Sequence, residues 1–196
     1  GRIEVPDGVT FIGDGAFSYN DFNRMELILP YSIDSIGNSA FYKCMYKCEL
    51  RLSDNITYIG SNVFGGWQDG GCWNFYGTFH IPSKLKELNS GAFSALGYDG
   101  SIQGDIVIPE SVTRIPEYLF SDMQIIQISL ANQVDLSIPS GVKEIGRDAF
   151  SGMRFKSLSL ADFIEVIESG AFQNCKMLFN LHLPKNLKTL GARCYD

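Results

Sequence analysis

The sequence predicts an α/β-type repeat solenoid, a right-handed coil with a stack of short parallel strands joined by turns and short helices. The first observation is the pattern P-x-x-Φ-x-x-Φ-G-x-x-A-F, with Φ aliphatic, which occurs eight times, at some copies with the proline or the final phenylalanine replaced. Its aromatic positions lie 22 to 30 residues apart, at Phe17, Phe41, Phe64, Phe93, Phe120, Phe150, Phe172 and Tyr195. A period of this length is typical of stacked repeats, in which each unit closes its core against its neighbours. We therefore expect residues 1–196 to form one solenoid of about eight repeats.

The second observation is a triplet before each proline position, with apolar outer residues and a variable middle residue. This alternation is typical of a strand with one buried face, and proline ends a strand because it has no N–H to donate. The triplets are Ile3-Glu4-Val5, Leu27-Ile28-Leu29, Leu50-Arg51-Leu52, Phe79-His80-Ile81, Ile106-Val107-Ile108, Leu136-Ser137-Ile138, Leu158-Ser159-Leu160 and Leu181-His182-Leu183.

The rest of each repeat predicts the interior. Two aliphatic residues three positions apart, such as Val142 and Ile145, precede a small residue that permits a tight turn and a ring that fills the coil. We expect all seven phenylalanines at the aromatic positions to be nearly fully buried and aligned along the coil axis.

Three long spacers follow one another in the middle of the chain, from 65 to 81, 94 to 108 and 121 to 138. In repeat proteins such insertions map to one face, which is often the binding face. The first spacer holds both tryptophans of the chain among several glycines, and the segment 124–130 of the third predicts an extra strand. Candidate binding rings in these loops are Trp67, Trp73, Phe75, Tyr76 and Tyr98. Rings that fold back to cover the coil are the alternative.

Two columns of outward side chains should cross the stacked strands. One holds the middle residues of the triplets, and the other holds the residue before each triplet, where carboxylates accumulate. Candidate binding residues on this strand face are Glu26, Glu49, Arg51, Thr78, His80, Asp105 and Asp135. The carboxylates are either a solvated surface of an acidic protein or a face for a basic partner or a divalent cation.

The complete repeat ends in A-F-x-x-C, as at Ala40 to Cys44 and Ala171 to Cys175, and in this form it resembles the BspA-like leucine-rich repeat family. The resemblance covers nearly the whole chain. It implies a leucine-rich-repeat solenoid on the surface of an anaerobic bacterium, a treponeme or a protozoan parasite, in a protein that acts as an adhesin or in host interaction. It transfers no binding residue, because the family shares none.

Cysteine and histidine spacing predicts neither a metal site nor a cofactor. Cys44 and Cys175 lie five coils apart and cannot form a disulfide, whereas Cys44 and Cys48 could pair locally. We expect mostly buried free thiols. His80 and His182 lie four coils apart, too far to ligate one zinc ion.

Motif and charge together predict a non-catalytic protein. The sequence has no nucleophile, zinc-protease or nucleotide-binding motif, and a Cys72–His80 pair would lack an orienting carboxylate. The net charge of −6 argues against a nucleic-acid partner, and no apolar run is long enough to insert into a membrane.

The expected function is a cell-surface, extracellular protein-interaction module with a protein partner, for example on a host surface or in matrix. The alternatives are a carbohydrate-binding module that uses the loop rings, or a spacer within a longer surface protein. Because the first strand has no polar cap, we also expect this chain to be the repeat portion of a longer protein or to pair with another copy.

Overall fold

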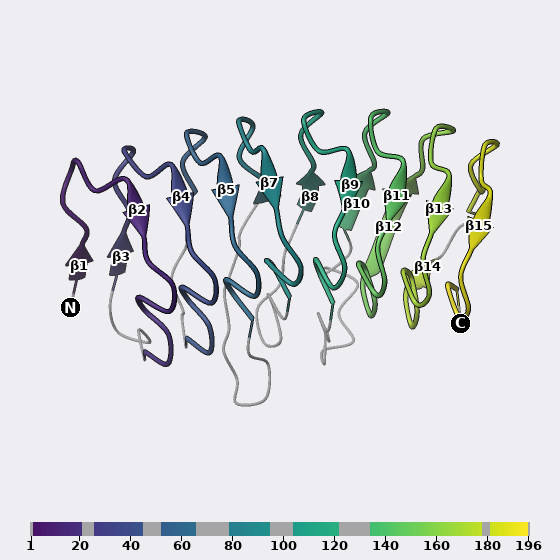
Figure 1. The fold of residues 1–196 in the computed structure, drawn as a ribbon. Helices are drawn as coiled ribbons and strands as arrows, with labels where there is room; N and C mark the ends of the chain where they lie inside the picture. Colours follow the sequence, from purple (N-terminus) through teal and green to yellow (C-terminus); the bar gives the residue numbers. More distant parts are fainter. Residues whose placement is uncertain are drawn as a thin grey trace.

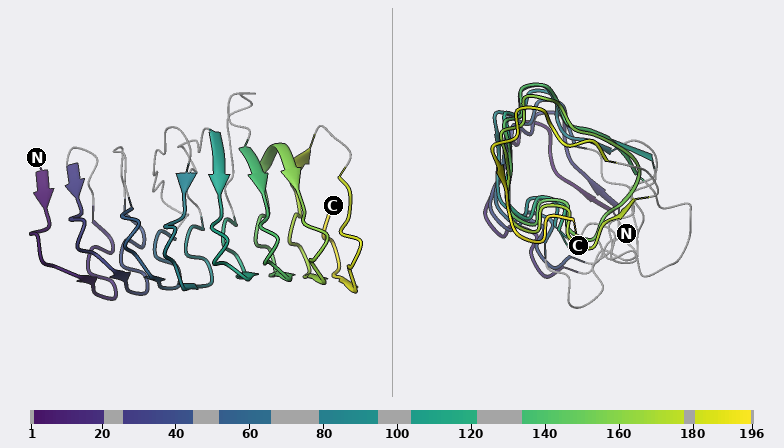
Figure 2. Two further views of the ribbon diagram at one scale, coloured as in Figure 1. Left: turned by 90° about the horizontal axis from the view of Figure 1, so that it is seen from above. Right: turned by 90° about the vertical axis from the view of Figure 1, so that its right-hand side faces the viewer.

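A computed structural model describes residues 2–20, 26–44, 52–65, 79–94, 104–121, 134–177 and 181–195. Coils stack along one axis, with the two termini at opposite ends (Figure 1). Seen along the axis, successive coils follow nearly the same outline (Figure 2). We number the coils 1 to 8 by their aromatic positions, from Phe17 to Tyr195. The predicted solenoid of stacked parallel strands is confirmed, because every strand pair is parallel and joins neighbouring coils.

The predicted short helices, and with them the α/β class, are wrong for the part of the chain that the structure describes, which contains strands and turns alone. The reason lies in the direction of the backbone N–H groups. They point along the solenoid axis to the neighbouring coil, as from Phe17 N to Ala40 O at 2.8 Å and from Phe120 N to Ala149 O at 2.7 Å. These groups are then not available for hydrogen bonds within a helix.

The first side of the solenoid, face A, is built mostly by strands at the predicted triplets, whereas its last strand, at Lys176–Met177, lies ahead of the triplet at 181–183. Strand β1 (Arg2–Glu4) pairs with β3 (Glu26–Ile28), and a five-stranded sheet follows in the order β14-β12-β10-β8-β6. Its members are β6 (Phe79–His80), β8 (Gly104–Val107), β10 (Val134–Ser137), β12 (Arg154–Ser159) and β14 (Lys176–Met177). The triplet at 181–183 is not a strand, so that prediction is wrong; Leu183 is exposed, and no buried face fixes its register.

The second side, face B, is built by two-residue strands that the sequence did not lead us to expect. Each ends on the second aliphatic residue of the pattern, which is buried in most coils. One sheet joins β2 (Phe11–Ile12), β4 (Ser35–Ile36), β5 (Tyr58–Ile59) and β7 (Glu87–Leu88). The other joins β9 (Arg114–Ile115), β11 (Glu144–Ile145), β13 (Val166–Ile167) and β15 (Thr189–Leu190).

The aromatic positions form a continuous ladder of rings through the core. Consecutive rings stack from Phe17 to Tyr195, with centroids 5.3 Å apart at Phe17–Phe41 and 6.0 Å apart at Phe120–Phe150. Six of the seven phenylalanines are buried, as predicted. Phe17, in the first coil, is only half-buried, so the prediction is wrong there.

A left-handed residue just before the small residue of each repeat makes the turn into the ring. The turn residues have φ between 50° at Asp148 and 70° at Gly170 and are Gly15, Ser39, Asn62, Gly91, Tyr118, Asp148, Gly170 and Arg193. The turn aims their N–H groups at the next coil, as from Tyr118 N to Arg147 O at 2.8 Å. The backbone conformation of this residue allows the coil to close, and the residue that follows is small in most coils but Val63 in coil 3 and Leu119 in coil 5.

Candidate interaction surfaces

Most of the residues that the sequence nominates lie outside the described part of the chain. These are Trp67, Trp73, Phe75, Tyr76, Tyr98, Glu49, Arg51 and Thr78, together with Cys48, Cys72 and the predicted strand at 124–130. Glu26 and Asp105 lie on β3 and β8, but their side chains are not described. His80 and Asp135 therefore represent the candidate set in the structure.

On face A, the outward column runs in register across four coils. His80 on β6 aligns with Val107 on β8, which aligns with Ser137 on β10 and then with Ser159 on β12. All four are exposed, while their strand neighbours Ile106, Leu136 and Leu158 are buried. Face A thus presents a column whose side chains differ in every coil, above a core whose side chains repeat.

Asp135 lies in the second column, in register with Asp105 and Ser157. Its carboxylate accepts a hydrogen bond from Lys156 Nζ at 2.8 Å and another from the Ser157 hydroxyl. A cation from the same protein therefore already offsets this carboxylate. Within the described residues, no three histidine, cysteine, aspartate or glutamate side chains lie close enough together to hold a metal ion.

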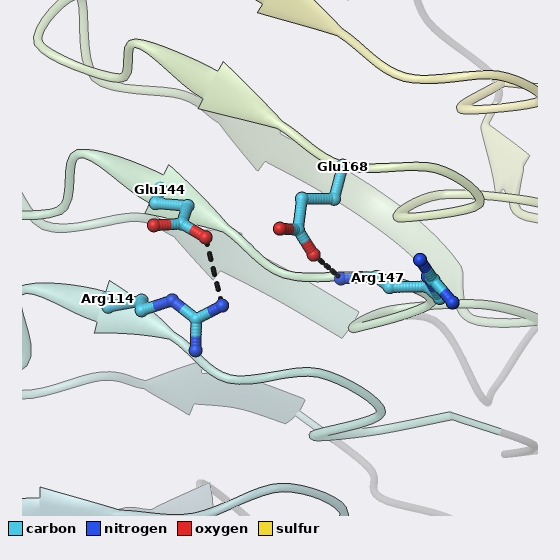
Figure 3. Close-up of polar contacts among 4 residues, drawn as sticks. All are labelled: Arg114, Glu144, Arg147 and Glu168. Atoms are coloured by element: carbon cyan, nitrogen blue, oxygen red, sulfur yellow. Dashed lines mark hydrogen bonds and ion pairs between the residues drawn. The ribbon is translucent and has the colours of Figure 1, made fainter.

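Face B carries ion pairs that join neighbouring coils. Arg114 donates to Glu144 Oε1 at 2.9 Å, and Glu168 accepts the backbone N–H of Arg147 at 2.8 Å (Figure 3). The hydrogen bond from Arg114 lowers the pKa of Glu144, and the same bond raises the pKa of Arg114. Cross-strand pairs of this kind stabilise adjacent strands by less than about 1 kcal/mol when exposed.

A cleft interrupts face B between coils 4 and 5, where β7 and β9 belong to different sheets. Its volume is about 220 Å³. The lining residues are Leu85, Lys86, Glu87, Leu88, Asn89, Ser111, Val112, Thr113 and Arg114. Within the described chain, no backbone hydrogen bond joins 85–89 to 112–116. At the next junction, by contrast, Lys143 N donates to Thr113 O at 3.1 Å and Gly146 N donates to Ile115 O at 2.9 Å.

The sequence contains one cause of this break. At the position of the pattern's glycine, coil 5 has Pro116, which has no N–H to donate to Leu88 O. The extra Cβ is not the reason, because Glu168 occupies the same position in coil 7 and still donates to Ile145 O at 2.9 Å. The proline in place of glycine can be seen in the sequence. That it removes a hydrogen bond between coils 4 and 5 could not be predicted, because the sequence did not show that face B is a sheet.

The described cysteines are free thiols that bond to the backbone of the preceding coil. Cys44 Sγ donates to Phe17 O at 2.7 Å, Cys175 Sγ donates to Phe150 O at 3.0 Å, and Cys194 Sγ donates to Glu168 O at 3.0 Å. Desolvation raises the pKa of Cys175 to about 12. The prediction of free thiols is confirmed for these three residues, although Cys175 is only half-buried.

The described residues contain no helix long and apolar enough to cross a bilayer. Their stacked parallel strands, with one ring per coil, define a solenoid protein of the leucine-rich-repeat class. The model of the BspA type leucine rich repeat region matches residues 1–98, 69–136 and 98–196, with 6 copies, and the chain belongs to this family.

The comparison with solved structures found a leucine rich cell surface protein from Faecalibacterium prausnitzii A2-165, which is 18% identical with a TM-score of 0.34. The match covers 91% of this chain and 60% of that one, so the chain spans less than two thirds of that protein. No curated protein matches the sequence.

Proposed function

We propose that the chain is a non-catalytic protein-interaction module displayed at a cell surface, with an adhesin-like role toward a protein of a host surface or matrix. The observation that carries this proposal is the contrast on face A. Inward positions repeat from coil to coil, while the exposed column changes from His80 to Val107, Ser137 and Ser159. Such a solenoid separates the residues that build the fold from those that are free to recognise a partner. Membership of the family supports the surface location.

The chemistry of the described thiols favours binding over catalysis. A thiolate is the nucleophilic form of cysteine, and a pKa of about 12 leaves Cys175 protonated at neutral pH. Burial also raises the pKa of Cys194. These cysteines act as packing residues, and four ion pairs of the described residues join neighbouring coils.

Binding of the purified chain to a panel of matrix proteins and to a glycan array tests the proposal. We expect a matrix or host-surface protein to bind, and Ser159→Arg on face A to weaken that binding by about tenfold, because a new charge at an interface is costly to desolvate. Ser169→Arg, also at an exposed serine but away from face A, is the matched control and should bind like the wild type.

Shortening residues 66–76 to an ordinary spacer tests the loop rings in the same assay. Loss of binding with the fold retained would assign the contact to Trp67, Trp73, Phe75 and Tyr76. Binding to glycans alone would replace the protein partner by a carbohydrate. No binding in either panel would favour the spacer role.

A further inference from the structure

The cleft between β7 and β9 exposes strand edges that every other face-B junction of the described coils covers. At those junctions, one coil donates N–H groups to the coil before it, as from Asp34 N to Thr10 O at 2.8 Å and from Gly37 N to Ile12 O at 2.8 Å. The equivalent acceptors on β7 are the carbonyls of Lys86 and Leu88, and neither receives a bond from coil 5. The other wall is the edge of β9 that faces coil 4, which forms no backbone hydrogen bond with β7 among the described residues.

The shape of the cleft is that of a small binding site with an apolar floor and a polar rim. Leu85 and Val112 are buried, while Leu88 is only half-buried, although the same position is fully buried in Ile59 and Ile115 of the flanking coils. The exposed rim carries Lys86, Glu87, Thr113 and Arg114. At about 220 Å³, the space is far larger than the roughly 10–15 Å³ that one bridging water needs.

The charges of the rim favour neither an anion nor a cation. Lys86 and Glu87 have opposite charges, and Arg114 is already paired with Glu144 at 2.9 Å. The carbonyls of Lys86 and Leu88 lack donors from coil 5, and a neighbouring strand would supply two N–H groups with the matching spacing. An extended polypeptide carries such groups, and adding a strand to an exposed sheet edge is a recurrent mode of peptide recognition.

We propose that this cleft docks an extended segment of a partner polypeptide, which adds as a strand to the free edge of β7. Backbone N–H groups of that segment donate to Lys86 O and Leu88 O, and one small apolar side chain covers Leu88. The segment must have an N–H at the position that Pro116 occupies in coil 5. This inference rests on the proposed function, because it names the segment through which a protein partner would engage the solenoid.

A synthetic peptide copying residues 141–149, capped at both ends, is the probe. In the intact chain this segment contains β11, which lies on the edge of β9 with Gly146 N donating to Ile115 O at 2.9 Å, so its fit to an edge of this kind is known. We expect saturable binding to the wild-type chain. The same peptide with Gly146→Pro has no N–H at the critical position and should bind about tenfold more weakly, since one backbone hydrogen bond is lost.

Pro116→Gly is the matching change in the protein. It restores the donor to Leu88 O, lets coil 5 close on coil 4, and should reduce peptide binding by about tenfold or more. If this variant fails to fold, the pair of peptides on the wild-type chain still decides the matter. Amide hydrogen exchange locates the bound peptide: we expect slower exchange at Leu88 and Arg114.

Three results would overturn the inference. One is no saturable binding of the peptide to the wild type. Another is protection at Thr189 and Leu190, whose outer edge on β15 has no strand beside it among the described residues, in place of Leu88 and Arg114. The third is equal binding of the glycine and proline peptides. None of these depends on the matrix and glycan panels, so failure of the cleft and failure of the proposed function are separable.

Discussion

Replacing Phe120 by alanine tests whether the ring ladder holds the solenoid together. The ring is fully buried and stacks on Phe93 at 5.5 Å and on Phe150 at 6.0 Å. Truncating a buried phenylalanine costs about 3–5 kcal/mol, and each lost stacking contact adds about 0.5–1.5 kcal/mol. We therefore expect Phe120→Ala to lower the free energy of unfolding by about 5 kcal/mol, a large share of the roughly 5–15 kcal/mol of a typical domain.

The matched control is Phe17→Ala at the first position of the ladder. Phe17 is half-buried and stacks on Phe41 at 5.3 Å, so its truncation should cost less, about 2 kcal/mol. Urea unfolding followed by circular dichroism compares the two variants with the wild type. Equal losses at Phe120 and Phe17, or no loss at Phe120, would refute the idea that the stacked rings are the shared core of neighbouring coils.

Three further predictions follow from single contacts. Tyr118 has φ 56°, a left-handed conformation that glycine adopts with less strain. Tyr118→Gly should therefore stabilise the chain by up to about 1 kcal/mol in urea unfolding, while Glu117→Gly beside it should destabilise the chain by a similar amount. The opposite order would contradict backbone strain at Tyr118. Glu144 has a pKa lowered by the hydrogen bond from Arg114, so its contribution is present above the unfolded-state pKa and is lost as the pH falls through the lower folded-state pKa. The stability difference between wild type and Glu144→Gln should accordingly shrink below about pH 4, and a difference that persists at lower pH would exclude this pair as its source. Cys175, with its pKa near 12, should be alkylated by iodoacetamide far more slowly in the folded chain than in urea, as mass spectrometry of the labelled peptide would show; equal rates would mean an accessible thiolate.

The sequence pattern predicted the structural features that recur in every coil. It missed the features that depend on hydrogen bonds to the neighbouring coil. The rings from Phe41 to Phe172 stack as expected, because a large ring that recurs once per coil is buried only in the centre of the coil. The alternation around Val107 and Ser137 correctly indicated which side chains face outward. Face B was missed, because its strands are two residues long and a single aliphatic residue such as Ile145 shows no period-two alternation.

The error on helices has the same origin. Intervals such as Val142 to Ile145 have the three-residue spacing of a helix, and nothing in one repeat shows that the N–H of Gly146 is already bound by Ile115 O of another coil. The same limit applies to the candidate site. His80 could be placed in its outward column, but the cleft beside Leu88 exists only because two coils fail to join.

The comparison of Glu168 with Pro116 shows how a departure from the repeat can be read for function. Both replace the same glycine, yet coil 7 keeps its hydrogen bond to coil 6 and coil 5 loses its bond to coil 4. A side chain at this position is therefore tolerated, and the missing N–H of Pro116 accounts for the lost bond to Leu88 O. Glycine at this position would supply the N–H that Leu88 O lacks from coil 5. Local departures of this kind are expected where a surface serves binding, which is why the cleft and not the ion pairs of face B is the place to test for a partner strand.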